Sequence, residues 1–319
     1  MKITRPAFLA ALVAGLAWTL AGCATTANIY NTNRNADTVS VVSRATYRVV
    51  DTIAVGQRPI GIAVNSAGSL VYAANSGSDS VSVISTARGK VVATVAVGAR
   101  PFGLDVNRDG TRVYVANSEG GTVSVIDTAT NAVIATVAVG RGPTEVAVDR
   151  NGAFAYVTNQ LGDSVSRIST ASNTVTATIP VGKRPMGIAV NRAASRVYVA
   201  NADGDTISVI DTAAGAVVAT IAVGTSPVDL LIDPSDTHVY AANQRGDSIS
   251  VISVATNAVA ATIAVGEGPT SIVLDPAGAF LYAVNRLTNA VSVVRIATHT
   301  VIATIREAGP ELAQGPATP

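Results

Sequence analysis

Short runs of alternating apolar and polar residues follow one another along most of the chain, separated by turn residues. In the segment from Val97 to Ala138, four such runs cover 103–106, 112–116, 122–126 and 133–137. They are rich in β-branched residues and alternate with a period of two, so each predicts a β-strand. Turns such as Asn107-Arg108-Asp109-Gly110 separate them. No window after the N-terminal segment shows the periodicity of an amphipathic helix.

This four-strand unit recurs every 42 residues without insertion or deletion. Seven tyrosines have this spacing: Tyr30, Tyr72, Tyr114, Tyr156, Tyr198, Tyr240 and Tyr282. Each is followed three positions later by an asparagine: Asn33, Asn75, Asn117, Asn159, Asn201, Asn243 and Asn285. Four antiparallel strands per repeat of this length are typical of a β-propeller blade. The sequence therefore predicts an all-β, seven-bladed propeller of four-stranded antiparallel blades.

One copy of the second strand reads Tyr156-Val157-Thr158-Asn159, and Val-Gly-x-x-Pro precedes most blades. In these motifs the chain resembles the YVTN-type propeller repeat family, from Ile29 to Ile305. Similar propellers include lactonases and the propeller subunits of quinone-cofactor amine dehydrogenases. No catalytic set of those proteins can be matched residue by residue here, so the resemblance implies the fold and not an activity.

The first copy lacks its first strand. The six first strands that can be counted begin at Pro59, Pro101, Pro143, Pro185, Pro227 and Pro269. Near the C-terminus, residues 309–314 imitate the Gly-x-Pro opening of a blade, one residue short of the expected position. We expect the tail, residues 307–319, to complete the first blade and close the ring. Its deletion should then lower the melting temperature by several degrees.

The N-terminus has the features of a secretory signal: a basic start, an apolar stretch over 7–20 and small residues before Cys23. Leu20-Ala21-Gly22-Cys23 resembles the bacterial lipobox, which implies cleavage and a lipid on Cys23. The alternatives are an ordinary signal peptide with an incidental cysteine, or an uncleaved anchor. We predict a signal over 1–22, a lipidated tether over 23–28, a propeller over 29–306 and the tail over 307–319. The expected location is the periplasmic or cell-surface face of a membrane, reached through the lipid.

Charge and cysteine content restrict the partners and the cross-links. Without Lys2 and Arg5 of the signal, 20 basic residues face 21 acidic ones, which argues against nucleic-acid binding by phosphate neutralisation. Cys23 is the only cysteine, so the fold must hold without disulfides although the exported compartment is oxidising. We expect a monomer.

Residues present in every copy are expected to stabilise the fold of the repeat rather than to carry a specific activity. We therefore interpret the tyrosines as strand packers with hydroxyls at the rim, and the asparagines as turn residues bonded to their own loops. His299 stands where other copies have Gly or Asn, which predicts a positive φ. Two histidines are too few for a zinc site, and no haem, nucleophile-elbow or phosphate-loop motif occurs. We predict no catalytic set, metal or cofactor.

The copies differ mainly at one predicted mouth of the central channel. The loops that lead into the first strands are basic in four successive blades and neutral to acidic in the next two. The candidate binding residues are Arg58, Arg100, Phe102, Arg141, Glu145, Lys183, Arg184, Asp229 and Glu267. Such a mouth would attract an anionic ligand or a charged partner. The alternative is that these exposed loops carry solubilising charge.

The sequence thus favours a non-catalytic scaffold of the cell envelope that binds a protein or a polymer through the loops of one mouth. The alternative is a propeller lactonase or an accessory subunit of a quinone-dependent dehydrogenase.

Overall fold

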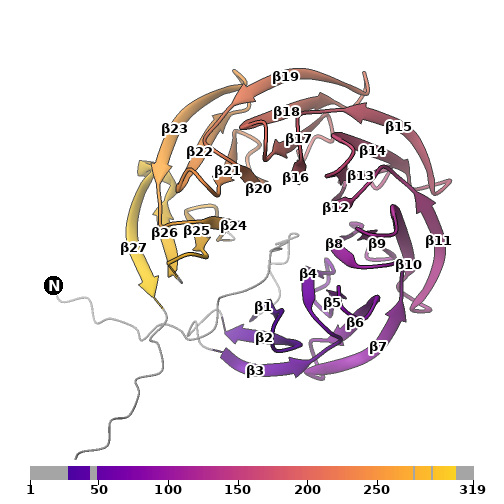
Figure 1. Ribbon diagram of the computed structural model, residues 1–319. Coiled ribbons are helices and arrows are strands. Elements are labelled where there is room, and N and C mark those ends of the chain that lie inside the picture. Colours follow the sequence, from indigo (N-terminus) through magenta and orange to yellow (C-terminus); the bar gives the residue numbers. More distant parts are fainter. Residues whose placement is uncertain (1–27, 44–48, 276, 289, 307–319) are drawn as a thin grey trace, which may run out of the picture.

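The computed structural model describes residues 28–43, 49–275, 277–288 and 290–306, which form a ring of seven β-sheets around a central channel (Figure 1). Each sheet is one blade, numbered from the N-terminus. Blade 1 contains three described strands, and blades 2 to 7 contain four each. The seven-bladed all-β propeller predicted from the 42-residue period is therefore confirmed.

The strands fall into four classes by their distance from the channel. The innermost are β4 (Pro59–Val64), β8 (Pro101–Val106), β12 (Pro143–Val148), β16 (Pro185–Val190), β20 (Pro227–Ile232) and β24 (Pro269–Leu274). The second are β1 (Asn28–Asn33), β5 (Leu70–Asn75), β9 (Arg112–Asn117), β13 (Phe154–Asn159), β17 (Arg196–Asn201), β21 (His238–Asn243) and β25 (Phe280–Asn285). The third are β2 (Thr38–Ser43), β6 (Ser80–Ser85), β10 (Thr122–Asp127), β14 (Ser164–Ser169), β18 (Thr206–Asp211), β22 (Ser248–Ser253) and β26 (Ala290–Arg295). The outermost are β3 (Val49–Ala54), β7 (Lys90–Ala96), β11 (Ala132–Ala138), β15 (Thr174–Pro180), β19 (Ala216–Ala222), β23 (Ala258–Ala264) and β27 (Thr300–Arg306).

The described part of blade 1 starts with the equivalent of a second strand, because β1 pairs with β2 in the same way that β5 pairs with β6. The tail proposed to complete this blade, residues 307–319, lies outside the described residues. The one described helical element is a single 3-10 turn, Ile296–Thr298. Within the described ranges, no helix is long and apolar enough to cross a membrane.

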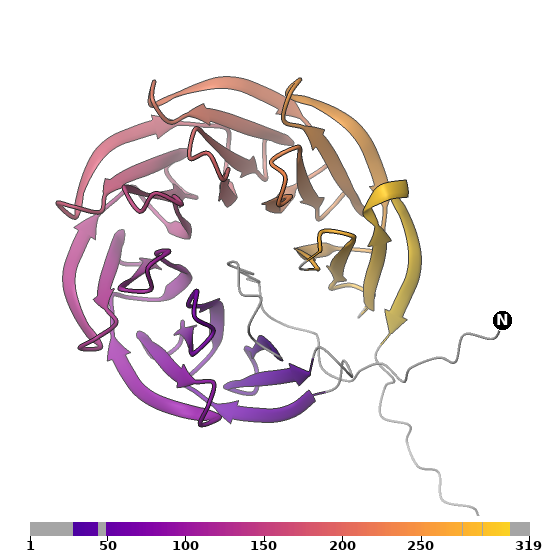
Figure 2. The ribbon, with the colours of Figure 1, turned by 180° about the vertical axis from the view of Figure 1, so that it is seen from behind.

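The channel has two mouths, and Figures 1 and 2 view the ring from its two sides. At the upstream mouth each innermost strand begins with its proline, which an edge strand tolerates because the missing N–H would face the channel. The loops there, such as 56–58, hydrogen-bond to the turns between second and third strands: Ser76 N donates to Arg58 O at 3.1 Å. At the downstream mouth each innermost strand ends in a tight turn, such as 107–111 or 149–153.

The hydrophobic core lies between the blades. Six clusters of buried side chains each join two consecutive blades, from blades 1 and 2 to blades 6 and 7. In the cluster between blades 2 and 3, for example, Tyr72 and Val83 pack with Leu104 and Ile126. A single blade leaves both faces apolar, so each blade is stabilised by its neighbours.

The tyrosine and asparagine ladder is structural, as predicted, although the details differ. Tyr72 is fully buried and its hydroxyl has no described partner, so the hydroxyl is not at the rim. Asn75 has no positive φ, and its amide donates to the Oγ atoms of Ser80 and Ser82 at 3.1 and 3.0 Å, not to its own loop. A β-carbon at Gly56 would lie 2.6 Å from the Asn75 amide nitrogen, which explains the recurring Val-Gly. The buried asparagine thus joins the second strand to the third by hydrogen bonds, and it packs closely against the glycine of the upstream loop.

Candidate functional site

The arginines predicted at the upstream mouth occupy a position with a left-handed backbone. Arg58, Arg100 and Arg184, each directly before a proline, have φ of 50°, 53° and 53°. Their backbone N–H groups donate to aspartates in the turns of the preceding blades, at 2.7–2.8 Å. Ser226 has the same conformation and the same kind of bond, to Asp205 at 2.7 Å. The backbone role is therefore independent of the arginine side chain.

Several charged side chains at this mouth are already engaged. Arg100 forms an ion pair with Glu119 at 2.7 Å, and Arg184 forms one with Asp203 at 3.1 Å. Arg141 donates to a backbone carbonyl, Leu161 O, at 2.9 Å. The remaining predicted loop residues are exposed, and their side chains form no hydrogen bond or ion pair among the described residues: Arg58, Lys183 and Glu267.

Positive charge at the upstream mouth also comes from two arginines that sequence reasoning missed. Arg34 and Arg286 occupy the first position of the second-to-third turns in blades 1 and 7, where other blades have Ser, Gln or Ala. Partial burial, and then the charges of Arg58, Arg100 and Arg286, lower the pKa of Arg34. The basic side of this mouth therefore extends across blades 7 and 1.

Phe102, Glu145 and Asp229 lie near the start of innermost strands, in β8, β12 and β20. A β-carbon at Gly61 would come within 2.2 Å of Phe102 O, so glycine there permits close approach of the next blade. Gly103 and Gly187 have the same relation to blades 4 and 6. Glu145 and Asp229 occupy the repeat position of these glycines in blades 4 and 6, and each lies against the glycine of the preceding blade.

Asp229 and Asp105 connect innermost strands of neighbouring blades. Asp229 accepts the N–H of Leu230 at 2.8 Å and that of Ile272, in blade 7, at 2.9 Å. Asp105 accepts the N–H of Val106 at 2.8 Å and that of Val148, in blade 4, at 2.9 Å. Burial raises the pKa of each to about 6, although these amide bonds act in the opposite direction. Sequence reasoning missed Asp105 because it reads as a polar position within an ordinary strand.

Glu145 is the third acid of the channel and is placed differently. Its carboxylate has no hydrogen-bond partner among the described residues, and a β-carbon at Gly103 would lie 2.3 Å from its Oε2. Burial, and then the charges of Asp229 and Asp105, raise its pKa to about 8. At neutral pH this group is therefore mainly protonated, unless a cation approaches it.

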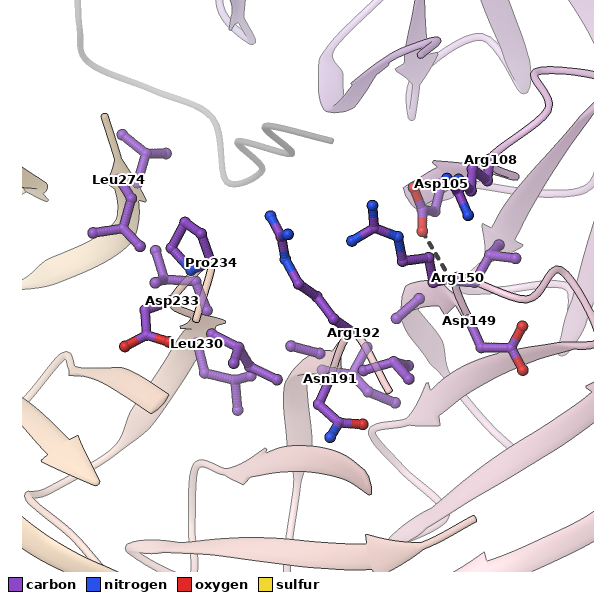
Figure 3. A pocket seen from close by; sticks show the side chains of 18 of the residues that line it. Asp105, Arg108, Asp149, Arg150, Asn191, Arg192, Leu230, Asp233, Pro234 and Leu274 are labelled. Carbon is purple, nitrogen blue, oxygen red and sulfur yellow. Dashed lines mark hydrogen bonds between the residues drawn. The ribbon is translucent and has the colours of Figure 1, made fainter. Parts of the chain in front are cut away.

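A cavity of about 730 Å³ opens at the downstream mouth (Figure 3). Arg108, Arg150 and Arg192 line it from the same repeat position in blades 3, 4 and 5, directly after the asparagine or aspartate that follows each innermost strand. Figure 3 shows the side chains of Arg150 and Arg192 reaching from their turns toward the middle of the cavity. None of the three guanidinium groups has a hydrogen bond or ion pair within the described part of the chain.

The turns that carry these arginines are fixed by their own side chains. The oxygens of Asn107, Asp149 and Asn191 each accept a backbone N–H four or five residues later, at 2.8–2.9 Å. Asp233 and Asp275 hold the turns of blades 6 and 7 in the same way. Asp236 accepts the backbone N–H groups of Arg192 and Ala193 at 3.1 and 3.3 Å. The turn acids therefore line the cavity, but their described bonds go to the turns and not to the three guanidinium groups.

Sequence reasoning missed this set of arginines. The signal was present, because the repeat position reads Ser66, Arg108, Arg150, Arg192 and Pro234 in consecutive blades. Taken singly, however, each arginine lies in a polar turn that looks like ordinary exposed surface.

The two histidines do not form a metal site in this structure. His299 has a φ of 52°, which confirms the predicted left-handed turn. His238 Nδ1 lies 3.3 Å from Asp233 Oδ2. No group of three or more His, Cys, Asp or Glu side chains within the described ranges is arranged to hold a metal ion.

Comparison with known proteins supports the fold. Residues 186–311 match a family model described as the YNCE-like beta-propeller. A chain of the hydrazine synthase from Kuenenia stuttgartiensis is 23% identical, with a TM-score of 0.78 and coverage of 86% of this chain and 94% of that one. A functionally unknown protein from Desulfotomaculum acetoxidans is 15% identical, with a TM-score of 0.77 and the same two coverages. No curated protein shows significant similarity. At these identities the solved structures share a fold with this chain, which resembles the YNCE-like propellers over its C-terminal blades.

Proposed function

We propose that this protein is a non-catalytic binding protein of the cell envelope that holds an anionic ligand at the downstream mouth of its channel. The observation that carries the proposal is that Arg108, Arg150 and Arg192 line one cavity and that their guanidinium groups have no bonding partner among the described residues. A guanidinium stays charged at any physiological pH and presents a planar set of donors that suits carboxylate and phosphate groups. The low-dielectric walls of the cavity strengthen the field of like charges.

The cavity also has a suitable size. Small-molecule sites usually enclose about 300–1,000 Å³, with a few polar groups among apolar walls. Here the apolar part of the wall comes from the last residues of the innermost strands, including Val148, Ala189 and Leu231. The fixed turns at the rim hold the bases of the arginine side chains in place, which lowers the ordering cost of binding.

Pyrophosphate is a suitable probe, measured by calorimetry at low ionic strength with residues 23–319 carrying Cys23→Ser. The triple variant Arg108→Ser, Arg150→Ser, Arg192→Ser should lose at least roughly a hundredfold in affinity, because each charge-assisted contact contributes about a factor of ten. Serine occurs naturally at this position as Ser66, so the turns should be preserved.

The matched control is Arg58→Ser, Arg100→Ser, Arg184→Ser at the upstream mouth. It removes the same net charge, and Ser226 occupies the same left-handed position in blade 6. The control should bind pyrophosphate within twofold of the unsubstituted protein. Equal losses in both triple variants, or no binding by the unsubstituted protein, would contradict the proposal.

The proposed location rests on the lipobox at Leu20-Ala21-Gly22-Cys23. Two or more acyl chains hold a protein firmly on a bilayer, whereas one binds weakly. Cells expressing the full chain should incorporate labelled palmitate into it and retain it in the membrane fraction. Cys23→Ser should abolish both; a membrane-bound Cys23→Ser protein would instead indicate an uncleaved anchor.

An enzymatic role is the second candidate, and Glu145 is the observation that favours it. A protonated carboxyl group in a channel could serve as a general acid. If purified protein hydrolyses lactones and Glu145→Gln abolishes the activity, the enzymatic candidate replaces the binding role.

A further inference from the structure

We infer that the ligand of the downstream mouth is amphoteric, with an anionic group at Arg108, Arg150 and Arg192 and an organic cationic group deeper in the channel near Asp105 and Asp229. The inference rests on the proposed function and names the chemical class of its ligand. It starts from the fact that both sets of side chains line the same cavity.

The two sets lie at different depths. The arginines follow the innermost strands, whereas Asp105 is three residues before Arg108 and Asp229 is five residues before Pro234, the equivalent of the arginines in blade 6. At about 3.3 Å per strand residue, the acids are roughly 10 and 17 Å farther along the chain toward the upstream mouth. A ligand that reaches both sets must therefore be elongated.

The two sets do not neutralise each other. The ion pairs in the described residues involve other partners: Arg100, Arg112, Arg184, Arg196 and His238 with Glu119, Asp127, Asp203, Asp211 and Asp233. The carboxylates of Asp105 and Asp229 accept backbone N–H groups. The cavity thus holds guanidinium groups at its rim and carboxylates deeper in the channel that are not paired with each other, although the turn acids Asp149, Asp233, Asp236 and Asp275 also line the rim.

The acidic region is deficient in positive charge. Burial raises the pKa values of Asp105 and Asp229, and the charges of these two raise that of Glu145 further. A buried carboxylate is unfavourable without a cation or a proton. A bound cation would favour the ionised forms of all three acids and would release protons as it binds.

An ammonium or guanidinium group suits this region better than a metal ion. The acids come from blades 3, 4 and 6, and no coordinating group of three side chains occurs in the described residues. An organic cation interacts through the field and through hydrogen bonds, and it does not need several oxygens at coordination distance.

Aminooctylphosphonate and octylphosphonate are the test probes, because they share the anionic group and the chain and differ in the amine. The first should bind residues 23–319 with Cys23→Ser at least about tenfold more tightly than the second at pH 7. Calorimetry in buffers of different ionisation enthalpy should show proton release with the amine probe and little with octylphosphonate.

Variants separate the two halves of the site. Asp105→Asn with Asp229→Asn should remove the preference for the amine and leave octylphosphonate binding intact or stronger. Glu145→Gln should reduce proton release. Because the Glu145 carboxylate has no described hydrogen-bond partner, this variant should fold, and it keeps the test valid if the double variant does not. The Arg108→Ser, Arg150→Ser, Arg192→Ser protein should lose both probes, and the upstream triple variant should retain both.

The outcomes distinguish this inference from the proposed function. If both phosphonates bind equally well through the three arginines, the site recognises only the anionic group of the ligand. The inference is then wrong while the proposed function stands. If neither phosphonate nor pyrophosphate binds, the proposed function fails as well. If the amine probe binds more tightly but Asp105, Asp229 and Glu145 are irrelevant, the cation lies elsewhere and the inference is also wrong.

Discussion

The two mouths of the channel each carry arginine at one repeat position in three blades, and they differ in what those arginines face. At the upstream mouth, Arg100 and Arg184 form exposed ion pairs, and the backbone at their position performs a structural task that serine also performs. At the downstream mouth, the three arginines line a cavity and have no partner in the described chain. Repetition of a charge in a propeller therefore does not identify a site, whereas convergence on a shared cavity does.

The difference has a simple energetic basis. Ion pairs between exposed side chains contribute about 0–1 kcal/mol, because water screens them and ordering the side chains costs entropy. The upstream arginines can therefore vary at little cost, as Ser226 and Gly268 show. The downstream arginines stand in the field of one another at the rim of a cavity, where an anion gains from all three at once.

Charge reversal at the middle of each set should produce the largest contrast. Arg150 lies between Arg108 and Arg192 in blade order, so Arg150→Glu removes one contact and adds repulsion. We expect a loss of at least roughly a hundredfold in pyrophosphate affinity by calorimetry. Arg100→Glu, the middle of the upstream set, should change affinity less than twofold. Similar losses for both would mean that the mouths do not differ in function.

The upstream mouth should be more important for stability than for binding. Asn201 is fully buried and its amide donates to Thr206 and Ser208 at 3.0 and 2.9 Å. Asn201→Ala should destabilise the fold by about 2 kcal/mol, because the hydroxyls of Thr206 and Ser208 lose their donor. Chemical denaturation measures this loss, and pyrophosphate affinity of the folded variant should be unchanged. A binding defect in the folded variant would show that the asparagine hydrogen bonds and the cavity are coupled.

The sequence predicted the ring and the structural role of the asparagines because both are periodic, but it did not predict that the asparagine amides bond to the third strand. Seven Tyr-x-x-Asn pairs determine the number of blades, and the six opening prolines reveal that the first blade begins at its second strand. The period could not show which loop side chains converge across blades. Arg150 and Arg100 look alike in the sequence. Their surroundings differ because Arg100 precedes an innermost strand and Arg150 follows one, which places them at opposite mouths. Asp105 was hidden for a related reason: it departs from the repeat in one blade only, and its partner, Val148, lies in the next blade.

Stability should fall as pH rises, because of the acids between the mouths. The pKa values of Asp105 and Asp229 are raised from 3.8 to about 6, and that of Glu145 is raised from 4.5 to about 8. Between these limits the folded chain holds protons that the unfolded chain has released, so their stabilising contribution is complete below about pH 4 and is lost through pH 6 to 8. We expect the melting temperature to decrease by several degrees from pH 5 to pH 9. Glu145→Gln should flatten the upper part of this decrease; an unchanged profile would show that Glu145 is ionised at no cost.

The smallest effect should come from releasing the upstream arginines. Glu119→Gln and Asp203→Asn break the ion pairs of Arg100 and Arg184, whose side chains are 46% and 36% exposed. Denaturation should detect a change of at most about 0.5 kcal/mol per pair, because both pairs are solvated. Pyrophosphate binding should also stay unchanged: free arginines on separate exposed loops gain little from an anion that only one of them can reach. A new upstream binding event, insensitive to Arg108→Ser, Arg150→Ser, Arg192→Ser, would show that the acidic partners, and not the position of the arginines, separate the two mouths.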